Sequence, residues 1–249
     1  TITILGCAYS IPDATHEPSH FAVQAECSGI MVDCGTNPTV RLAQAGIDYD
    51  SITDLILTHF HPDHISGAPL MLMNMWLLGR KQTLHIYAPE HCLQRFNQMM
   101  ESYDWQQWPG FFPVDLHPIP LYENAPVLAN SDFTIRASPG DHMVPAIGLR
   151  IKDESGGRVL AYSGDTSPCA NISRMAAGAD VLIHEATGAS LGHSSATQAG
   201  EVAEQAQVGT LYLIHYDIRK SAESKLLAEA RSQFRGPIKL ARDLMQIDL

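Results

Sequence analysis

Residues 57–67 of the chain read LTHFHPDHISG and place three histidines and an aspartate within six positions. The run DLIL that precedes them, residues 54–57, is mostly apolar and predicts a buried β-strand that ends just before His59. Two interpretations of the polar cluster are open: a solvated loop, or one wall of a metal site. The pattern H-x-H-x-D-H arises by chance in roughly one such sequence per thousand, which favours the metal site.

The composition is that of a globular protein. Of 249 residues, 45% are hydrophobic and 17% are charged, as in a chain with a well-buried core. We expect a single α/β domain that spans residues 1–249. No apolar run approaches the roughly 18 residues that a membrane span requires, so we expect no membrane partner.

The five cysteines are odd in number and show no C-x-x-C spacing, which argues against a disulfide framework and against a cysteine-based zinc site. They are Cys7, Cys27, Cys34, Cys92 and Cys169. The first residues, TITILGCAYSIP, have neither the basic start nor the long apolar stretch of a signal peptide. These two observations predict a reducing, cytoplasmic location.

The charge balance of the chain is acidic. Lys and Arg number 16 and Asp and Glu number 27, which gives a formal net charge of −11, and no Lys/Arg cluster is found in the sequence. Proteins that bind nucleic acid usually present a basic face. The charge therefore disfavours RNA as a partner, although a local basic patch is compatible with it.

Strand and helix patterns alternate along the whole chain, with no low-complexity linker and no internal repeat. Residues 65–78, ISGAPLMLMNMWLL, are apolar on most sides and predict one buried helix. Residues 194–207 predict another helix, which begins with an S-x-x-Q capping box from Ser195 to Gln198. Strands and helices in this order predict two β-sheets covered by helices, with ligands bound where strands end.

Further metal-binding side chains follow predicted strands in the second half of the chain. His142 lies in SPGDH, Asp165 in YSGDT and His215 in YLIHYD. Imidazole and carboxylate ligands without thiolate are typical of zinc, manganese or iron rather than calcium. An aspartate in a tight Gly-Asp turn suits the bridge between two metal ions, which favours Asp165 for that role.

These motifs resemble a known family. H-x-H-x-D-H after an apolar strand resembles the signature of the metallo-β-lactamase superfamily, and THFHPDHISG is similar to its ribonuclease Z-like branch. SPGDH, VPAIGLRI and YSGDT support that branch, and HEATGASLGHSSATQAGEVAEQA is similar to the HEAT and HST motifs of tRNA 3′-processing endonucleases and related phosphodiesterases. The resemblance runs from ILGCAYSIP to LIHYDIR and implies an αββα sandwich, with two mixed β-sheets flanked by helices.

The resemblance also implies a set of metal ligands, shared between two divalent ions. They are His59, His61 and His142 for one ion, and Asp63, His64 and His215 for the other, with Asp165 as the bridge. Zinc is the first choice of metal, and manganese and iron are the alternatives.

The same resemblance assigns catalysis to Asp63, Glu185 and His193. Asp63 would orient or deprotonate the attacking water, and His193, paired with Glu185, would donate a proton to the leaving oxygen or stabilise charge on the phosphoryl group. The residues give separate support for His193, which lies just outside a predicted helix N-terminus, where free N–H groups attract an anion. The helix dipole disfavours a charged imidazole there and Glu185 favours it, which suits a general acid. The alternative is that the pair only braces the turn.

Two stretches are candidates for substrate contacts. The first loop, GCAYSIPDATHEPSH, lies where the family places such contacts and contains Tyr9, Ser10 and His20. The aromatic residues between Trp105 and Phe112 either wall a pocket or pack in the core.

One part of the family pattern is missing. The tRNA-processing enzymes carry a long arm, inserted between the GDH histidine and the GDT aspartate, that grips the tRNA elbow. Here only residues 143–164 separate His142 from Asp165, and two strands with the turn KDESGG fill that interval. The chain therefore lacks the arm.

Four functions compete on this basis. The first is a dinuclear metal-dependent hydrolase that uses a metal-activated water on a small phosphodiester or related ester. A ribonuclease Z-type tRNA 3′-end endonuclease is favoured by the HEAT and HST motifs and disfavoured by the missing arm and the negative charge. A lactone or thioester hydrolase is disfavoured by the retention of Glu185 and His193, and a non-catalytic metal-binding module by the complete ligand set. The resemblance also implies a homodimer.

Overall fold

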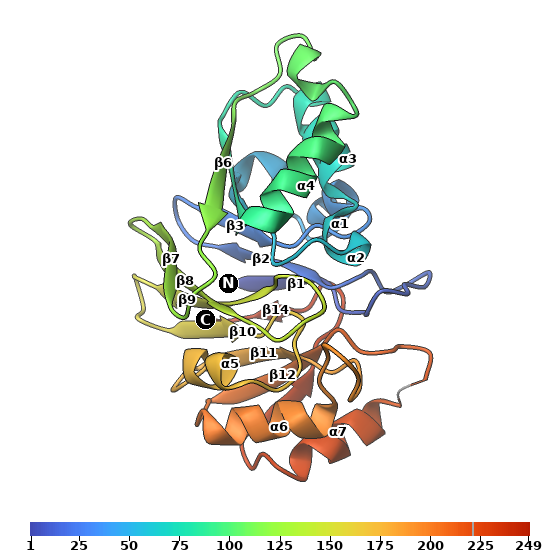
Figure 1. Cartoon of the computed structure of the whole chain (residues 1–249), viewed down its shortest axis with the longest axis vertical. Coiled ribbons are helices and arrows are strands. Elements are labelled where there is room, and N and C mark those ends of the chain that lie inside the picture. Colours follow the sequence, from blue (N-terminus) through green and yellow to red (C-terminus); the bar gives the residue numbers. More distant parts are fainter. Residues whose placement is uncertain (221) are drawn as a thin grey trace.

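The structure, a computed structural model, describes residues 1–220 and 222–249. In these ranges two seven-stranded β-sheets pack face to face, and helices cover the outer face of each sheet (Figure 1). Helices from the first half of the chain lie above the sheets in this view, and helices from the second half lie below them. The predicted αββα sandwich, with two mixed β-sheets flanked by helices, is confirmed.

The first sheet is built from the first half of the chain and the last strand. Its strands are β1 Ile2–Gly6, β2 His20–Gln24, β3 Gly29–Val32, β4 Ile52–Ile56, β5 Leu84–Pro89, β6 Val114–Ile119 and β14 Gln246–Ile247. They lie in the order β14-β1-β2-β3-β4-β5-β6, and the pairs from β3 to β6 are parallel. The carboxyl ends of β3, β4 and β5 therefore meet at one end of the sheet, and β6 is an outermost strand.

The second sheet repeats this arrangement. Its strands are β7 Ala125–Ala129, β8 Phe133–Pro139, β9 Ile147–Asp153, β10 Val159–Tyr162, β11 Val181–Glu185, β12 Thr210–Ile214 and β13 Ile238–Leu240. They lie in the order β13-β12-β11-β10-β9-β8-β7, and the pairs from β10 to β13 are parallel. The antiparallel pair of β9 and β10, joined by a short turn, occupies the interval between His142 and Asp165. This interval holds no inserted arm.

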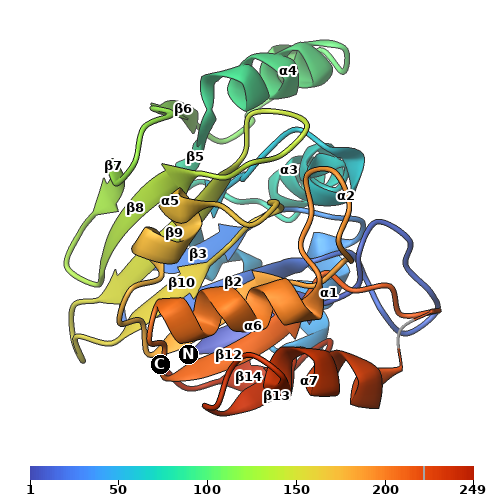
Figure 2. The same ribbon diagram turned by 60° about the horizontal axis from the view of Figure 1, so that its bottom comes forward.

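Seven helices are found in the described part of the chain. They are α1 Pro38–Gln44, α2 Pro62–Ile65, α3 Ala68–Leu77, α4 Glu90–Glu101, α5 Ala170–Met175, α6 Ala196–Gln205 and α7 Glu223–Arg231. Two short 3-10 helices lie at Tyr49–Ser51 and Trp105–Gln107. Figure 2 shows α6 and α7 side by side along the second sheet. Across residues 1–220 and 222–249, none of the helices combines the length and the apolar character that a membrane crossing demands.

The apolar side chains form two clusters. The larger cluster fills the space between the sheets and continues beneath α5–α7, and in it the rings of Phe21 and Tyr162 meet edge to face at 5.0 Å. The other cluster lies beneath α1–α4 and contains Phe96, Trp105 and Phe112. Trp105 and Phe112 are buried, so these two aromatic residues are core packing rather than a pocket wall.

The helix predicted over residues 65–78 is wrong in one respect, because α2 and α3 break at Ser66 and Gly67. A Cβ on Gly67 would overlap the carbonyl oxygen of Gly35, so the loop after β3 packs directly against this break. The Gly67 amide donates to the carbonyl of Cys34 at 3.0 Å, outside the helical pattern. Pro69 has no N–H with which to continue the hydrogen bonds of α2. The break fixes α2 against the end of β3.

Candidate active site

The candidate site lies where the carboxyl ends of strands from both sheets meet. β4 leads to His59, β8 to His142, β10 to Asp165 and β12 to His215. Because β8, β10 and β12 run in the same direction through their sheet, their carboxyl ends lie together, as ligand sites in α/β folds require. The predicted site residues are thus brought together from distant parts of the sequence. They are His59, His61, Asp63, His64, His142, Asp165, Glu185, His193 and His215.

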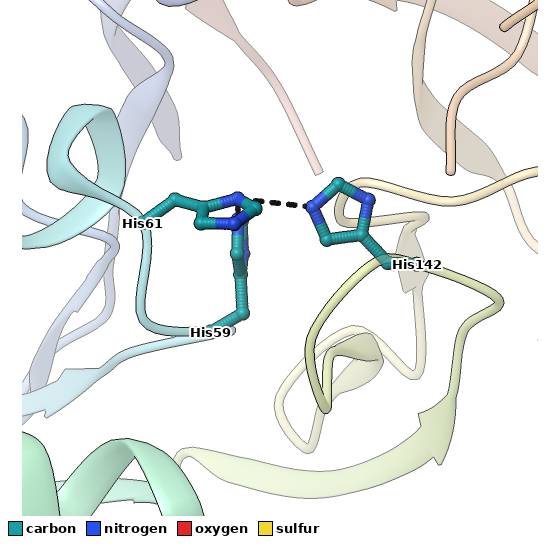
Figure 3. A group of neighbouring side chains, drawn as sticks. All are labelled: His59, His61 and His142. Carbon is teal, nitrogen blue, oxygen red and sulfur yellow. Dashed lines mark hydrogen bonds between the residues drawn. The ribbon is translucent and has the colours of Figure 1, made fainter. Parts of the chain in front are cut away.

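The first group in the site consists of His59, His61 and His142, which Figure 3 shows converging from the segment between β4 and α2 and from the loop after β8. His61 Nδ1 lies 3.1 Å from His59 Nε2 and 3.1 Å from His142 Nε2. Tetrahedral zinc, with Zn–N distances of about 2.0–2.1 Å, places its ligand atoms about 3.3 Å apart. The three nitrogens are therefore spaced as ligands of one ion.

The second group consists of Asp63, His64 and His215. His215 Nε2 lies 3.3 Å from His64 Nε2 and 3.3 Å from Asp63 Oδ2, and His64 Nε2 lies 3.5 Å from Asp63 Oδ2. These separations again match the edges of a small coordination polyhedron.

Asp165 lies between the two groups. Its Oδ2 atom is 3.4 Å from His64 Nε2, 3.5 Å from His215 Nε2 and 4.0 Å from His59 Nε2. A single carboxylate thus faces ligand atoms of both groups, which is the position of a bridge between two ions.

Asp33 and Thr58 orient two of the histidines. The Asp33 carboxylate accepts hydrogen bonds from His64 Nδ1 at 2.8 Å, from the Thr58 amide at 2.8 Å and from the Thr58 hydroxyl at 3.0 Å. Because that hydroxyl donates its proton to Asp33, its oxygen accepts from His59 Nδ1 at 3.0 Å. Both imidazoles therefore direct Nε2 into the site, as second-shell hydrogen bonds to metal-binding histidines do.

Two further hydrogen bonds act in the same way on the other side of the site. His142 Nδ1 donates to the carbonyl of Gly192 at 2.7 Å. His215 Nδ1 donates to the Thr187 hydroxyl at 2.8 Å, and that hydroxyl donates in turn to the carbonyl of His215 at 2.8 Å. Four of the five imidazoles are thus held by Nδ1 and present Nε2 as the ligand atom.

The surroundings of these candidate ligand atoms favour a bound cation. Asp165 Oδ1 is buried and has no hydrogen-bond partner within the described ranges. Burial lowers the pKa of His64, but Asp165 and Asp33 outweigh it and hold the pKa well above its ordinary value. In the same way, burial raises the pKa of Asp165, but His215 and His64 hold it well below its ordinary value. Divalent cations supply the charge that such a donor set demands, so the residues present fit a metal site.

Glu185 and His193 form a pair beside the ligands. Glu185 is buried at the end of β11, and its Oε1 accepts from His193 Nδ1 at 3.0 Å and from the Thr166 amide at 2.9 Å. Burial lowers the pKa of His193, but the hydrogen bond and charge of Glu185 raise it above its ordinary value. The pair leaves His193 Nε2 as the nitrogen that can exchange a proton with a substrate.

His193 lies just before α6, whose predicted capping box is confirmed. The Ser195 hydroxyl accepts from the Gln198 amide at 3.2 Å, and the Gln198 side chain accepts from the Ser195 amide at 2.8 Å. These bonds fix the chain where it enters the helix and thereby fix the backbone that carries His193.

Asp165 is placed by a turn that requires glycine. Gly164 has a φ of +58°, and a Cβ at this position would overlap the carbonyl oxygen of Ile147. A residue without a side chain is therefore needed for β10 to turn directly into Asp165.

Several orienting residues were not identified from the sequence. Asp33 follows β3, next to β4, and the rule that polar residues gather at strand ends could have indicated it. Thr58 and Thr187 carry no such signal, because hydroxyl groups are common in loops and only the folded path brings these two to the histidines.

The candidate substrate contacts of the first loop lie in different places. His20 is buried in β2, where Nδ1 donates to the carbonyl of Pro18 at 2.7 Å, so it lines no substrate surface. The Tyr9 hydroxyl accepts a hydrogen bond from Arg219 at 3.1 Å. The Tyr9 amide donates to the carbonyl of Tyr216, the residue after His215, at 3.2 Å. Ser10 is exposed in the same loop.

Comparison with known proteins shows what the sequence and the fold of this chain are similar to. Residues 29–216 match the family model described as the beta-lactamase superfamily domain. The ribonuclease Z of Mycobacterium sp. (strain KMS) is 31% identical over 277 aligned positions, which cover 100% of this chain and 95% of the relative. Among solved structures, the metallo-beta-lactamase fold protein YhfI from Bacillus subtilis has a TM-score of 0.83 and 25% identity, covering 98% of this chain and 97% of YhfI. Human tRNase Z, short form (ELAC1), has a TM-score of 0.81 and 24% identity, covering 99% of this chain and 98% of that chain.

Together, the fold and the site define a metal-dependent hydrolase of the αββα type. The chain belongs to the beta-lactamase superfamily and, within it, to the ribonuclease Z-like branch. The alignment with the Mycobacterium enzyme spans 277 positions whereas this chain has 249 residues, so the relative contains segments without a counterpart here.

Proposed function

We propose that the chain hydrolyses phosphodiesters with the help of two divalent metal ions, zinc being the first choice. The observation that carries the proposal is the position of Asp165 Oδ2, within 4.0 Å of His59 Nε2 and within 3.5 Å of His64 Nε2 and His215 Nε2. The ligands would be His59, His61 and His142 for one ion, and Asp63, His64 and His215 for the other, with Asp165 shared. Bound ions would supply an activated water and balance the charge of the phosphoryl group.

The protein's own residues would orient the attacking water. Burial raises the pKa of Asp63, but His215 and His64 hold it below its ordinary value, so the carboxylate is ionised. Its side chain is partly exposed, in contrast to the buried His64 and Asp165. An ionised, partly exposed carboxylate among the ligands can accept a hydrogen bond from the attacking water. This hydrogen bond would direct a lone pair of the water oxygen at the substrate.

His193 would act on the opposite side of the reacting phosphorus. With Nδ1 bonded to Glu185 and its pKa raised by that carboxylate against the effect of burial, the ring can carry a proton on Nε2. It would donate this proton to the leaving oxygen or balance charge on the phosphoryl group. Glu185 and His193 are retained in the motifs that resemble those of tRNA 3′-processing endonucleases and related phosphodiesterases, so the pair favours phosphoryl chemistry over a lactone or thioester hydrolase.

A tRNA 3′-end endonuclease is the alternative that a specific observation favours. The Mycobacterium relative, aligned along the whole of this chain, is named ribonuclease Z. Against this alternative, β9 and β10 leave no arm between His142 and Asp165, and the net charge is −11. We therefore place small phosphodiesters first. A homodimer and a cytoplasmic location are also part of the proposal. All five cysteines are free, which supports a reducing location.

The test measures metal content and turnover of bis(p-nitrophenyl) phosphate by the wild type, Asp165→Ala and His193→Ala. We expect about two metal ions per wild-type chain, loss of metal in Asp165→Ala, and retained metal with turnover lowered about 10²–10⁴-fold in His193→Ala. His91→Ala, which replaces a histidine on α4 that is not among the predicted site residues, serves as the control and should behave as the wild type.

Two outcomes would contradict the proposal. Metal binding without turnover of the diester would move the lactone or thioester alternative to the front. Full activity in His193→Ala would show that the Glu185–His193 pair has no catalytic role and only stabilises the turn before α6.

A further inference from the structure

A second cluster of metal-ligating side chains lies on the first sheet, outside the candidate active site. His85 on β5 and Asp115 and His117 on β6 each offer one ligand atom, and these atoms lie within 4.8 Å of one another. His85 pairs with Asp115 across the parallel strands, and His117 follows two residues later on β6. Because alternate residues share a face of a sheet, the three side chains project from the same face.

This cluster is well separated from the hydrolytic centre. In the sheet register His85 pairs with Asp54 on β4, whereas the first active-site ligand, His59, lies beyond the end of that strand. Five residues of extended chain correspond to about 16 Å. The two sets of ligands therefore belong to opposite ends of neighbouring strands.

The spacing of the second cluster matches that of the first. His85 Nδ1 lies 3.1 Å from His117 Nε2 and 3.6 Å from Asp115 Oδ2. The corresponding separation of His61 Nδ1 and His142 Nε2 in the candidate active site is also 3.1 Å. Tetrahedral zinc sites have ligand atoms about 3.3 Å apart, so little movement is needed to admit an ion.

Neighbouring residues hold one ligand and leave the others accessible. The ring of His117 stacks on Tyr87, with centroids 4.6 Å apart and an interplanar angle of 18°. Burial and the nearby Asp54 raise the pKa of Tyr87 to about 12, so its hydroxyl stays neutral. The side chains of His85 and Asp115 are 38% and 58% exposed, which lets an ion enter from solvent.

The local charge favours a cation. Asp115 is paired with no Lys or Arg anywhere in residues 1–220 and 222–249, and its one ion-pair neighbour there is His85. The chain as a whole carries a net charge of −11. Nothing in the described surroundings therefore competes with a metal ion for the carboxylate.

From this geometry we propose that His85, Asp115 and His117 bind a divalent transition-metal ion of the zinc class, with the fourth position open to water. The site does not take part in hydrolysis. β6 is one of the two outermost strands of the first sheet, and the chain passes from it to β7 of the second sheet. The ion joins β6 to β5 and so stabilises an edge strand that has a neighbour on one side only.

The test measures the number of zinc ions bound per chain. The metal-loaded protein is dialysed to equilibrium against zinc chloride, and its zinc content is then determined by elemental analysis. We compare the wild type with His85→Gln, His117→Gln and the milder Asp115→Asn, and use His91→Gln as the matched control. The wild type and the control should bind one zinc ion more per chain than either glutamine variant. Asp115→Asn should lower the affinity for this additional zinc ion at least about tenfold.

The comparison does not depend on how many ions the hydrolytic centre holds, because only the difference between variants is read. Turnover of the diester by all variants shows that they are folded, since none of the three residues lies in the hydrolytic centre. Added zinc should also raise the Tm of the wild type more than that of the glutamine variants. Equal zinc content in the wild type, the control and the glutamine variants would overturn the proposal.

Discussion

At the scale of single residues, Asp33 links ligands of both groups. Its carboxylate accepts from His64 Nδ1 directly, and it fixes His59 through the Thr58 hydroxyl. One carboxylate thus orients both imidazoles by accepting from one directly and from the other through a hydroxyl. The candidate site therefore extends beyond its candidate ligands. Those ligands could be predicted from the sequence, and Asp33 could have been found from its place after a strand, whereas Thr58 and Thr187 could not.

His20 provides a prediction at this scale. Burial lowers its pKa to about 4 from an ordinary value of 6.5. Between these values the unfolded chain binds a proton that the folded chain does not bind. The stability associated with neutral His20 is therefore complete above pH 6.5 and is lost as the pH falls toward about 4. The whole difference corresponds to at most about 3 kcal/mol.

The variant His20→Asn removes the titrating group and keeps an amide that can donate to the Pro18 carbonyl. In urea unfolding at about pH 7.5 and about pH 4.5, the wild type should lose about 2–3 kcal/mol more stability than the variant. Parallel losses in the two proteins would show that His20 does not resist protonation in the fold.

At the scale of elements, the turn from β10 into Asp165 carries the next prediction. Gly164→Ala adds a Cβ that overlaps the Ile147 carbonyl at a φ of +58°. Gly178→Ala is the matched control, since its φ is +63° and nothing lies within 4 Å of the added Cβ. Backbone strain alone should cost about 1 kcal/mol in the control, and strain with overlap about 2–4 kcal/mol in Gly164→Ala.

The two glycine variants should also differ in metal content. We expect Gly164→Ala to lose metal because the shifted turn displaces the Asp165 carboxylate, while Gly178→Ala keeps the wild-type content. Urea unfolding and elemental analysis measure the two effects. Equal metal content in both variants would show that the turn does not position Asp165.

The elements also show what the sequence could predict. The strands before His59, His142, Asp165 and His215 were recognisable because each apolar run ends in a residue type that binds metals. The capping box of α6 was recognisable because its two members lie three residues apart. The break between α2 and α3 was not, because it depends on the contact of Gly67 with Gly35, which lies on another segment. Local patterns thus predicted the elements and the residues that meet at the candidate site, and long-range contacts decided the rest.

At the scale of the whole molecule, the two sheets each supply part of the candidate site. The first sheet and α2 carry His59, His61, Asp63 and His64, and the second sheet carries the other ligands. Neither half holds a complete ligand set for either ion. The candidate site therefore forms only when the two sheets are packed together.

The charge of the whole molecule bears on its affinity for a large polyanion. Its net charge is −11, and the interval that holds the arm in tRNA-processing enzymes is filled by β9 and β10. Two cations follow His215, but Arg219 and Lys220 lie 3.9 Å and 3.8 Å from Asp217, which offsets their charge. Affinity for nucleic acid depends mainly on cations that neutralise phosphates, and both of these cations are already paired with a carboxylate.

The last prediction concerns precursor tRNA. We expect the metal-loaded protein to hydrolyse bis(p-nitrophenyl) phosphate while binding a precursor tRNA with a Kd weaker than about 10 μM at physiological salt, the range of non-specific contacts. The tRNA should therefore inhibit diester turnover only weakly, measured by competition, and an endonuclease that carries the arm serves as the positive control. Binding below about 1 μM with cleavage at the 3′ end, lost in Asp165→Ala, would instead assign the chain to tRNA processing. The protein would then have to grip its substrate without the arm, through a surface that its charge does not reveal.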